Sequence, residues 1–213
     1  MADPAFEIVV CRGAQGRPCP YALPVDPGLP GRLEGRIAAS GWPALLAARL
    51  TGGARHHHRF QLAVAGCANG CSRPHIADVG LIRACRPQVD PAACTGCGAC
   101  EAACPDGAVS LADSLAVVDP AACLACGRCV AVCPTGAMSG ADGWRVVAGG
   151  RLGRRPRLAS ELPELMSEAE ALAVLGKSLA WYMSAWRPNL RFGDLLAAGG
   201  TARLLAGERP WPS

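Results

Sequence analysis

The sequence predicts an α+β protein in which a small cysteine-rich module interrupts a larger domain. Two short apolar segments, residues 6–10 and 59–66, are bounded by polar residues or glycine, as expected of buried strands. Apolar residues spaced three and four apart after Ser167 predict a helix in the last part of the chain. Between these elements, residues 89–111 recur at 118–140 with 15 of 23 positions identical, which indicates an internal duplication.

The composition limits the class of protein. The 213 residues and 13 cysteines leave room for one ordinary domain and a small module. Because the chain opens without a charged and apolar leader and has no apolar run of about 18 residues, we expect a cytoplasmic protein with no membrane span. Only Lys177 among the 21 basic residues is a lysine, an arginine bias that indicates GC-rich coding rather than nucleic-acid binding. In a reducing compartment, cysteines are more often metal ligands than disulfides.

The duplicated segment carries the pattern C-x2-C-x2-C-x3-C-P in both copies. Three thiolates at two-residue gaps wrap a short loop around one corner of an iron–sulfur cubane, and a fourth cysteine followed by proline reaches a second cluster. Glycines in the loops let the backbone approach the cluster closely. Two zinc sites or a disulfide knot are the alternatives, but zinc sites use separated C-x2-C pairs and fit this spacing badly.

Residues 89–141 resemble the bacterial two-cluster ferredoxins through this motif. The resemblance implies a βαββαβ module that holds two 4Fe-4S clusters and transfers single electrons. It assigns the first cluster to Cys94, Cys97, Cys100 and Cys133, and the second cluster to Cys123, Cys126, Cys129 and Cys104.

Each predicted strand of the larger domain is followed by a pair of cysteines. Cys11 and Cys19 follow the first strand, and Cys67 and Cys71 follow the second. Four thiolates at two strand ends could close a third cubane. Packing thiols without a cluster are the alternative, since free cysteine packs as a small apolar residue. Cys85 has no partner in either pattern and is expected in the core.

A second resemblance covers most of the remaining chain. Residues 66–73, G-C-A-N-G-C-S-R, resemble the G-C-P-N-x-C-A/S-R segment of the sirohaem-dependent sulfite and nitrite reductases, with Ala68 in place of the usual proline. The family's earlier pair is spaced C-x5-C, whereas Cys11 and Cys19 are spaced C-x7-C. Residues 149–156 resemble the G-G-K/R-x-G-R-x-P segment that follows the ferredoxin insert in dissimilatory and anaerobic-type sulfite reductase subunits.

This resemblance implies a sirohaem-reductase-type half-domain, made of residues 1–88 and 142–213, into which the module at 89–141 is inserted. The four cysteines of the half-domain would hold a third 4Fe-4S cluster, and Cys71 would also bridge that cluster to the iron of sirohaem.

Several arginines are candidates for binding anions. Arg73, Arg151 and Arg154 would face sirohaem carboxylates or a bound oxyanion, because guanidinium groups match carboxylate geometry. A solvated strand end is the alternative, and we favour it for Arg155 and Arg157.

The resemblance implies an electron relay. A donor such as a reduced ferredoxin or a flavoprotein would reduce the module, and electrons would reach the third cluster and then sirohaem or a partner's active site. Ten residues precede Cys11, where the family's smallest catalysts carry a longer substrate-binding segment. We therefore expect an oxidoreductase component completed by a partner subunit, with a start codon further upstream as the alternative explanation. A complete sirohaem-containing sulfite or nitrite reductase subunit and a non-catalytic ferredoxin-like scaffold of a larger redox complex stay open.

Two further segments have local signals. Residues 56–58 are three adjacent histidines in a polar stretch and are expected to form a solvated loop. Ser167 and Glu170 have the spacing of a capping box, and Pro188 is expected to end the helix that begins there.

Overall fold

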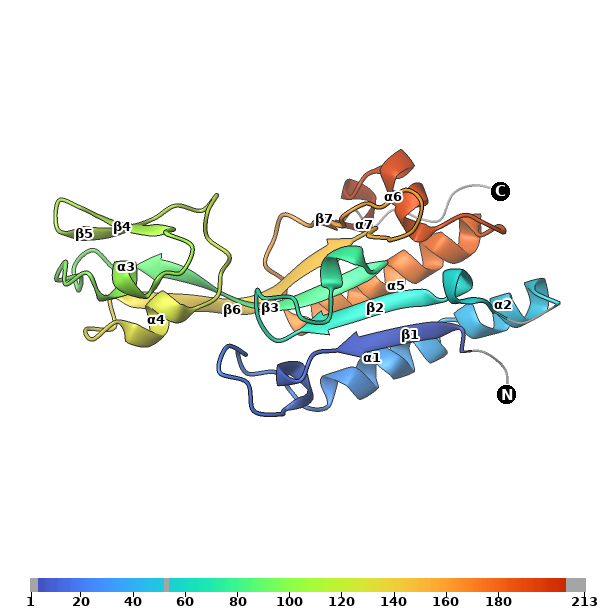
Figure 1. Ribbon diagram of the computed structural model, residues 1–213, viewed down its shortest axis with the longest axis horizontal. Helices are drawn as coiled ribbons and strands as arrows, with labels where there is room; N and C mark the ends of the chain where they lie inside the picture. The colour runs from blue at the N-terminus through green and yellow to red at the C-terminus, as the bar shows by residue number, and fades with distance from the viewer. Residues whose placement is uncertain (1–3, 52–53, 206–213) are drawn as a thin grey trace.

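The computed structural model describes residues 4–51 and 54–205. Its main feature is a five-stranded mixed sheet with the strand order β1-β2-β3-β6-β7 (Figure 1). The first three strands are parallel, and β6 and β7 continue the sheet antiparallel to their neighbours. The strands are β1 (Phe6–Val10), β2 (Phe60–Ala65), β3 (Val79–Val89), β6 (Met138–Ala148) and β7 (Ser160–Glu161).

The two predicted strands of the larger domain are confirmed as β1 and β2. Parallel neighbours need a crossover connection, which α1 (Leu29–Ala38) and α2 (Trp42–Arg49) supply. Both strands run in the same direction, toward the end of the sheet from which the duplicated segment projects (Figure 1). The cysteine pairs that follow β1 and β2 therefore start from the same edge of the sheet.

The helix α5 (Glu168–Ala185) packs with α1 on one face of the sheet. Its capping box is confirmed, since the Ser167 N–H donates to Glu170 Oε2 at 2.8 Å and the Glu170 N–H donates to Ser167 Oγ at 3.3 Å. One face of the helix is buried, and the Tyr182 ring stacks on Trp42 with a centroid distance of 4.8 Å. The helix ends at Ala185, just before Pro188.

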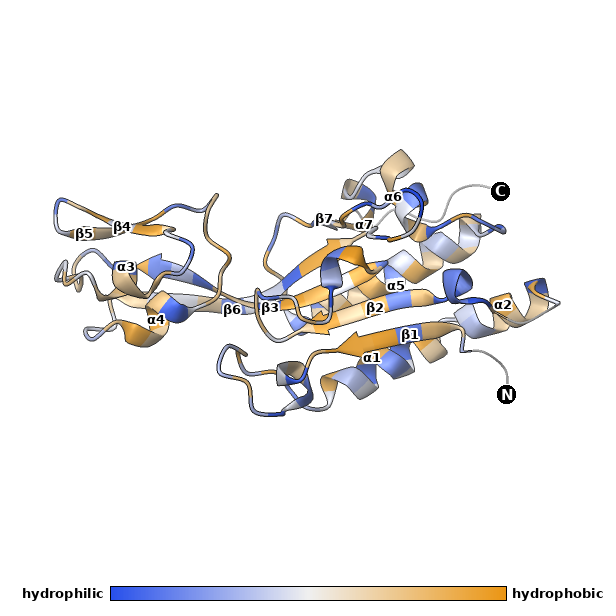
Figure 2. Cartoon of the chain, viewed as in Figure 1, coloured by the Kyte–Doolittle hydropathy of each residue, from blue (hydrophilic) through white to orange (hydrophobic). Residues whose placement is uncertain are grey.

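The hydropathy pattern follows this packing. The strands of the main sheet are mostly apolar, whereas the covering helices mix polar and apolar residues (Figure 2). The remaining elements of the larger domain are the short helices η1 (Gly13–Gln15), η2 (His56–His58), η3 (Pro74–Ile76), α6 (Phe192–Gly199) and α7 (Ala202–Leu205). Within the described residues, no helix is both long and apolar enough to cross a membrane.

The strands β3 and β6 carry the duplicated segment away from the sheet (Figure 1). They form one continuous antiparallel ladder from Val79↔Ala148 to Val89↔Met138. Between them lie α3 (Ala99–Ala103), β4 (Val109–Ala112), β5 (Leu115–Val118) and α4 (Arg128–Val132). The boundaries expected at residues 88 and 142 fall inside the ladder, so the duplicated segment is joined to the sheet by paired strands rather than by linkers.

Candidate functional site

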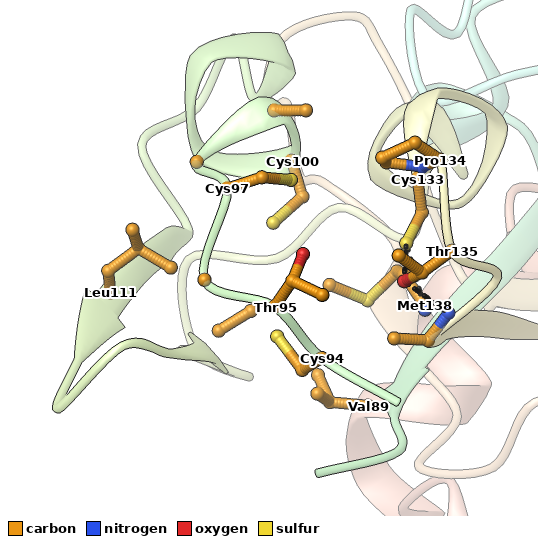
Figure 3. A pocket seen from close by; sticks show the side chains of 15 residues that line it. Val89, Cys94, Thr95, Cys97, Cys100, Leu111, Cys133, Pro134, Thr135 and Met138 are labelled. Carbon is orange, nitrogen blue, oxygen red and sulfur yellow. Dashed lines mark hydrogen bonds between the residues drawn. The ribbon is translucent and has the colours of Figure 1, made fainter. Parts of the chain in front are cut away.

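The first cavity of interest lies in the duplicated segment and has a volume of about 350 Å³. Four thiols line it, and Figure 3 shows their sulfur atoms facing a common space. Three come from the first copy of the repeat and one from the second copy: Cys94, Cys97, Cys100 and Cys133.

Two backbone features shape the wall of this cavity. Gly96 has a φ of +65°, and a Cβ at this position would lie 2.5 Å from the carbonyl oxygen of Ser114, so a side chain does not fit. Cys133 Sγ accepts the N–H of Met138 at 3.3 Å and lies 3.7 Å from Thr135 Oγ1 (Figure 3). These hydrogen bonds, the one from Met138 foremost, lower the pKa of the Cys133 thiol and favour its thiolate.

A second cavity of about 300 Å³ is lined by the complementary set of thiols. The Ala108 N–H donates to Cys104 Sγ at 3.2 Å, and the Ala125 N–H donates to Cys123 Sγ at 3.4 Å. Burial raises the pKa of the Cys129 thiol to about 11, so a metal that binds there must displace its proton. The four thiols are Cys104, Cys123, Cys126 and Cys129.

Cys85 lies beside the second cavity but lines neither cavity. Its N–H donates to the Ala125 carbonyl at 2.8 Å. A Cβ on Gly140 would lie 2.2 Å from Cys85 Sγ, which leaves the thiol enclosed at 8% exposure. Cys85 is therefore a buried packing residue, as predicted.

The third set of cysteines lies where β1 and β2 end. Cys11 Sγ accepts the N–H of Gly66 at 3.1 Å and the N–H of Ala14 at 3.4 Å. Burial raises the pKa of the Cys67 thiol, and the other three thiols of the set add smaller contributions in the same direction. Cys11, Cys19 and Cys71 are thus each within electrostatic reach of Cys67. Cys71 is the exposed member of this set.

The C-x7-C spacing does not keep Cys19 away from the set. The loop after Cys11 folds back so closely that a Cβ on Gly13 would lie 2.4 Å from Ala22 Cβ and 3.2 Å from Cys19 Cβ. The absence of a side chain at Gly13 is what allows this approach.

An open cavity of about 1130 Å³ lies between the third cysteine set and the second cavity and shares lining residues with both. Cys67 and Asn69 line one side, and Cys126 and Arg128 line the other. The Arg128 guanidinium lies 5.4 Å from the centroid of the Tyr21 ring, which joins the Cys11–Cys19 side of the domain to α4. The third set therefore adjoins the second cavity.

The candidate arginines have different surroundings. Arg151 forms an ion pair with Asp194 and donates from Nε to the Arg155 carbonyl at 2.8 Å. Arg157, expected to be solvated, instead donates to the Gly193 carbonyl at 2.8 Å and pairs with Asp194 at 3.4 Å. Arg151 and Arg157 thus form ion pairs and hydrogen bonds within the fold, which gives both of them a structural role.

The other candidates lie at the surface. Arg73, with a φ of +58°, and Arg154 are exposed, as is Arg155. The histidines of η2 are largely exposed, in line with the expected loop, although they form a single helical turn.

The surroundings of two charged groups, Asp78 and Arg145, were not predicted by any sequence pattern. Asp78 is 1% exposed, and burial raises its pKa to about 6 although Arg191 lies 3.6 Å away. Arg145, on β6, reaches the loop that holds Cys123 and donates to the Leu124 carbonyl at 3.2 Å. Both contacts join residues that are distant in the sequence, so no local pattern predicts them.

The thiol sets fit a cluster better than a single ion. In residues 4–51 and 54–205, no three histidine, cysteine or carboxylate side chains converge closely enough to hold one metal ion. A cubane needs a wider arrangement, because its four thiolates bind four different iron atoms. Amide hydrogen bonds to sulfur, as at Cys11, Cys104 and Cys133, are among the features that tune iron–sulfur clusters.

Two curated relatives match parts of the chain. A coenzyme F420-dependent sulfite reductase from Methanocaldococcus jannaschii is 37% identical over 54 residues, which cover 25% of this chain and 9% of that protein. A subunit of the anaerobic sulfite reductase from Salmonella typhimurium is 32% identical over 102 residues, which cover 48% of this chain and 25% of that protein. The chain thus matches a quarter or less of the length of these relatives.

The fold has a counterpart among solved structures. The Mycobacterium tuberculosis NirA protein superposes with a TM-score of 0.51 and 14% identity, over 92% of this chain and 26% of that chain. The likeness concerns the fold alone.

The family described as "Nitrite and sulphite reductase 4Fe-4S domain" matches residues 48–207, well over half of the chain. The match supports at least one iron–sulfur cluster on this protein. The chain belongs to the nitrite and sulphite reductase 4Fe-4S domain family.

Proposed function

We propose that this chain is an electron-transfer subunit of a sulfite or nitrite reductase, with residues 89–141 as an inserted two-cluster ferredoxin module. The observation that carries the proposal is the crossed lining of the two cavities, in which each copy of the repeat contributes three thiols to one cavity and one thiol to the other. This exchange is the ligand pattern of two-cluster ferredoxins. The order of elements also supports the module, since the end of β3, α3, β4, β5, α4 and the start of β6 follow one another as βαββαβ.

Cys11, Cys19, Cys67 and Cys71 are proposed to hold a third cluster. Their support is the shared strand edge, the amide hydrogen bonds to Cys11 Sγ and the electrostatic contributions of the other three thiols at Cys67. Three clusters, when bound, would supply one-electron redox chemistry in steps suited to a six-electron reduction.

The protein around the proposed clusters has three tasks. The glycine loops let the backbone follow each cluster closely, and amide groups donate to the thiolates. The β3–β6 ladder holds the module at a fixed distance from the sheet. The cavity shared by Cys67 and Cys126 brings the second module site, rather than the first, next to the third set. We therefore place the first module site at the donor side.

Cys71 is proposed as the thiol that would meet sirohaem. It is the exposed member of its set, and exposed Arg73 follows two residues later. Arg73 and Arg154 would bind sirohaem carboxylates or an oxyanion, whereas Arg151 is already paired with Asp194.

A partner subunit is part of the proposal. The Salmonella relative is itself named as a subunit, and the family's chemistry needs a donor and a substrate site that this chain would share with other proteins. The proposed donor is a reduced ferredoxin or a flavoprotein.

A reductive titration of anaerobically purified protein tests the proposal. Three clusters should take up about three electrons per chain, one for each cubane. A Soret band and a band in the red in the absorbance spectrum would show sirohaem on this chain, and turnover of sulfite or nitrite by the purified chain alone would favour a complete reductase subunit instead. Uptake of no electrons by protein with full iron and sulfide content would overturn the relay and leave a scaffold role.

A further inference from the structure

We propose that Arg145, held in place by Glu161, raises the reduction potential of the cluster in the second cavity above that of the cluster in the first cavity. This inference rests on the proposed function, because it requires clusters bound in both cavities. A residue outside the cysteine motifs would thus give the two clusters of a duplicated module different reduction potentials.

Three observations place Arg145 next to the second cysteine loop. Its Nη1 donates to the Leu124 carbonyl at 3.2 Å, and Leu124 directly follows Cys123. Arg145, Glu161 and Cys123 also line a common open cavity. Glu161 raises the pKa of Arg145, and Cys123 adds a smaller electrostatic contribution in the same direction. The guanidinium charge is thus felt at a proposed cluster ligand.

Glu161 fixes the guanidinium group. Its two carboxylate oxygens accept from Arg145 Nε at 2.7 Å and from Nη2 at 2.5 Å, a bidentate pair that leaves Nη1 for the Leu124 carbonyl. Glu161 comes from β7 and Arg145 from β6, which pair in the main sheet. The arginine is therefore supplied and paired by the larger domain, and it contacts the module through the Leu124 carbonyl.

The positive charge outweighs the negative one at the second cavity because the two groups differ in exposure. The Arg145 side chain is 15% exposed and reaches the cysteine loop, whereas the Glu161 side chain is 39% exposed. A more exposed charge is screened more strongly by water and salt. Reduction adds one negative charge to a cluster, so a nearby positive charge favours the reduced form.

For the first cysteine loop, the described residues show no hydrogen bond from an arginine like the one that Arg145 donates to Leu124. Among the described residues that line the first cavity, only the four cysteines are ionisable. Asp106 and Arg128 also line the second cavity, with opposite charges. The residue of the first copy that corresponds to Leu124 is Thr95, which lines the first cavity. The repeat alone would predict two similar sites, and the difference arises because the second cysteine loop lies against β3 and β6, where the Ala125 carbonyl accepts from the Cys85 N–H and the Leu124 carbonyl accepts from Arg145.

Potentiometry monitored by electron paramagnetic resonance tests the inference on the full chain. Cys100→Ser and Cys129→Ser, which each remove one ligand from one of the two clusters, assign the two module signals. Arg145→Gln should lower the ratio of reduced to oxidised second cluster at a fixed potential by roughly three- to tenfold, the size expected of a partly buried charge. The first cluster should keep its potential. Glu161→Gln should move the second cluster in the opposite direction.

Matched variants separate charge from structure. Arg151→Gln removes an arginine that is also 15% exposed and paired with a carboxylate, that of Asp194, and it should leave both potentials unchanged. Arg145→Lys keeps the charge without the bidentate pair and should stay near the wild-type potential.

The outcomes distinguish this inference from the proposed function. Wild-type protein with no cluster in the second cavity after reconstitution would refute the proposed function itself. Intact clusters with equal potentials in wild-type and Arg145→Gln proteins would overturn the role of Arg145 alone. Equal potentials of the second cluster in Arg145→Lys and Arg145→Gln proteins would also overturn it, because only the lysine variant keeps the positive charge.

Discussion

Cys133 and Cys94 line the same cavity although they belong to different copies of the internal repeat. The exchange is reciprocal, since Cys104 of the first copy lines the cavity built by the second copy. Each proposed cluster therefore depends on both copies, and neither copy forms a complete site by itself.

The first prediction concerns this exchange. Cys104→Ser should perturb the paramagnetic signal of the cluster held by Cys123, Cys126 and Cys129, because it removes that cluster's fourth ligand. Cys133→Ser should perturb the other module cluster. Cys85→Ala is the control, since Cys85 is buried but lines neither cavity. A change confined to the Cys94 site in Cys104→Ser would refute the assignment.

The second prediction concerns the third cysteine set. Fully reconstituted protein should carry about 12 iron atoms and 12 sulfides per chain, four for each cubane. Cys67→Ser should reduce both numbers to about eight and leave the module signals unchanged. Wild-type protein that saturates at about eight would show that Cys11, Cys19, Cys67 and Cys71 pack without a cluster.

The third prediction concerns the loop at Gly96. Gly96→Ala places a Cβ 2.5 Å from the Ser114 carbonyl oxygen at a φ of +65°, so we expect loss of stability beyond the roughly 1–2 kcal/mol of a left-handed residue. The first module cluster should become labile. Gly107→Ala is matched in conformation, with a φ of +62° and no atom within 4 Å of the added Cβ. Denaturant unfolding and iron content measure both effects, and equal behaviour of the two variants would contradict the close approach.

The fourth prediction concerns pH. Burial raises the pKa of Asp78 from 3.8 to about 6, so the folded protein binds this proton more tightly than the unfolded chain does. The protonated carboxyl therefore contributes fully to the free energy of unfolding below about pH 4. This contribution is lost as the pH rises through about 6, and it amounts to at most about 3 kcal/mol. In Asp78→Asn this component should vanish, and the variant should be no less stable than wild type at pH 7. The measurement is the difference between the two denaturant midpoints as a function of pH, which cancels any cluster loss shared by both proteins. A difference that does not vary with pH would contradict the prediction.

Several features were predictable because they depend on short-range patterns. The apolar segments that became β1 and β2, the capping box of Ser167 and Glu170 and the burial of Cys85 follow from neighbouring residue types and their intervals. The cysteine sets and their sorting among clusters stay predictions, although the cavities gather the thiols in the expected groups.

The sequence by itself determined the local elements and which cysteines have the spacing of cluster ligands, because both are encoded at intervals of a few residues. Tertiary structure decided the contacts between distant segments. Strand pairing joined the module to the sheet through the β3–β6 ladder and brought Arg145 to the Cys123 loop. Packing enclosed Asp78 and paired Arg151 with Asp194. Such contacts depend on how separate elements pack against one another, and a sequence pattern with a short period does not predict that packing.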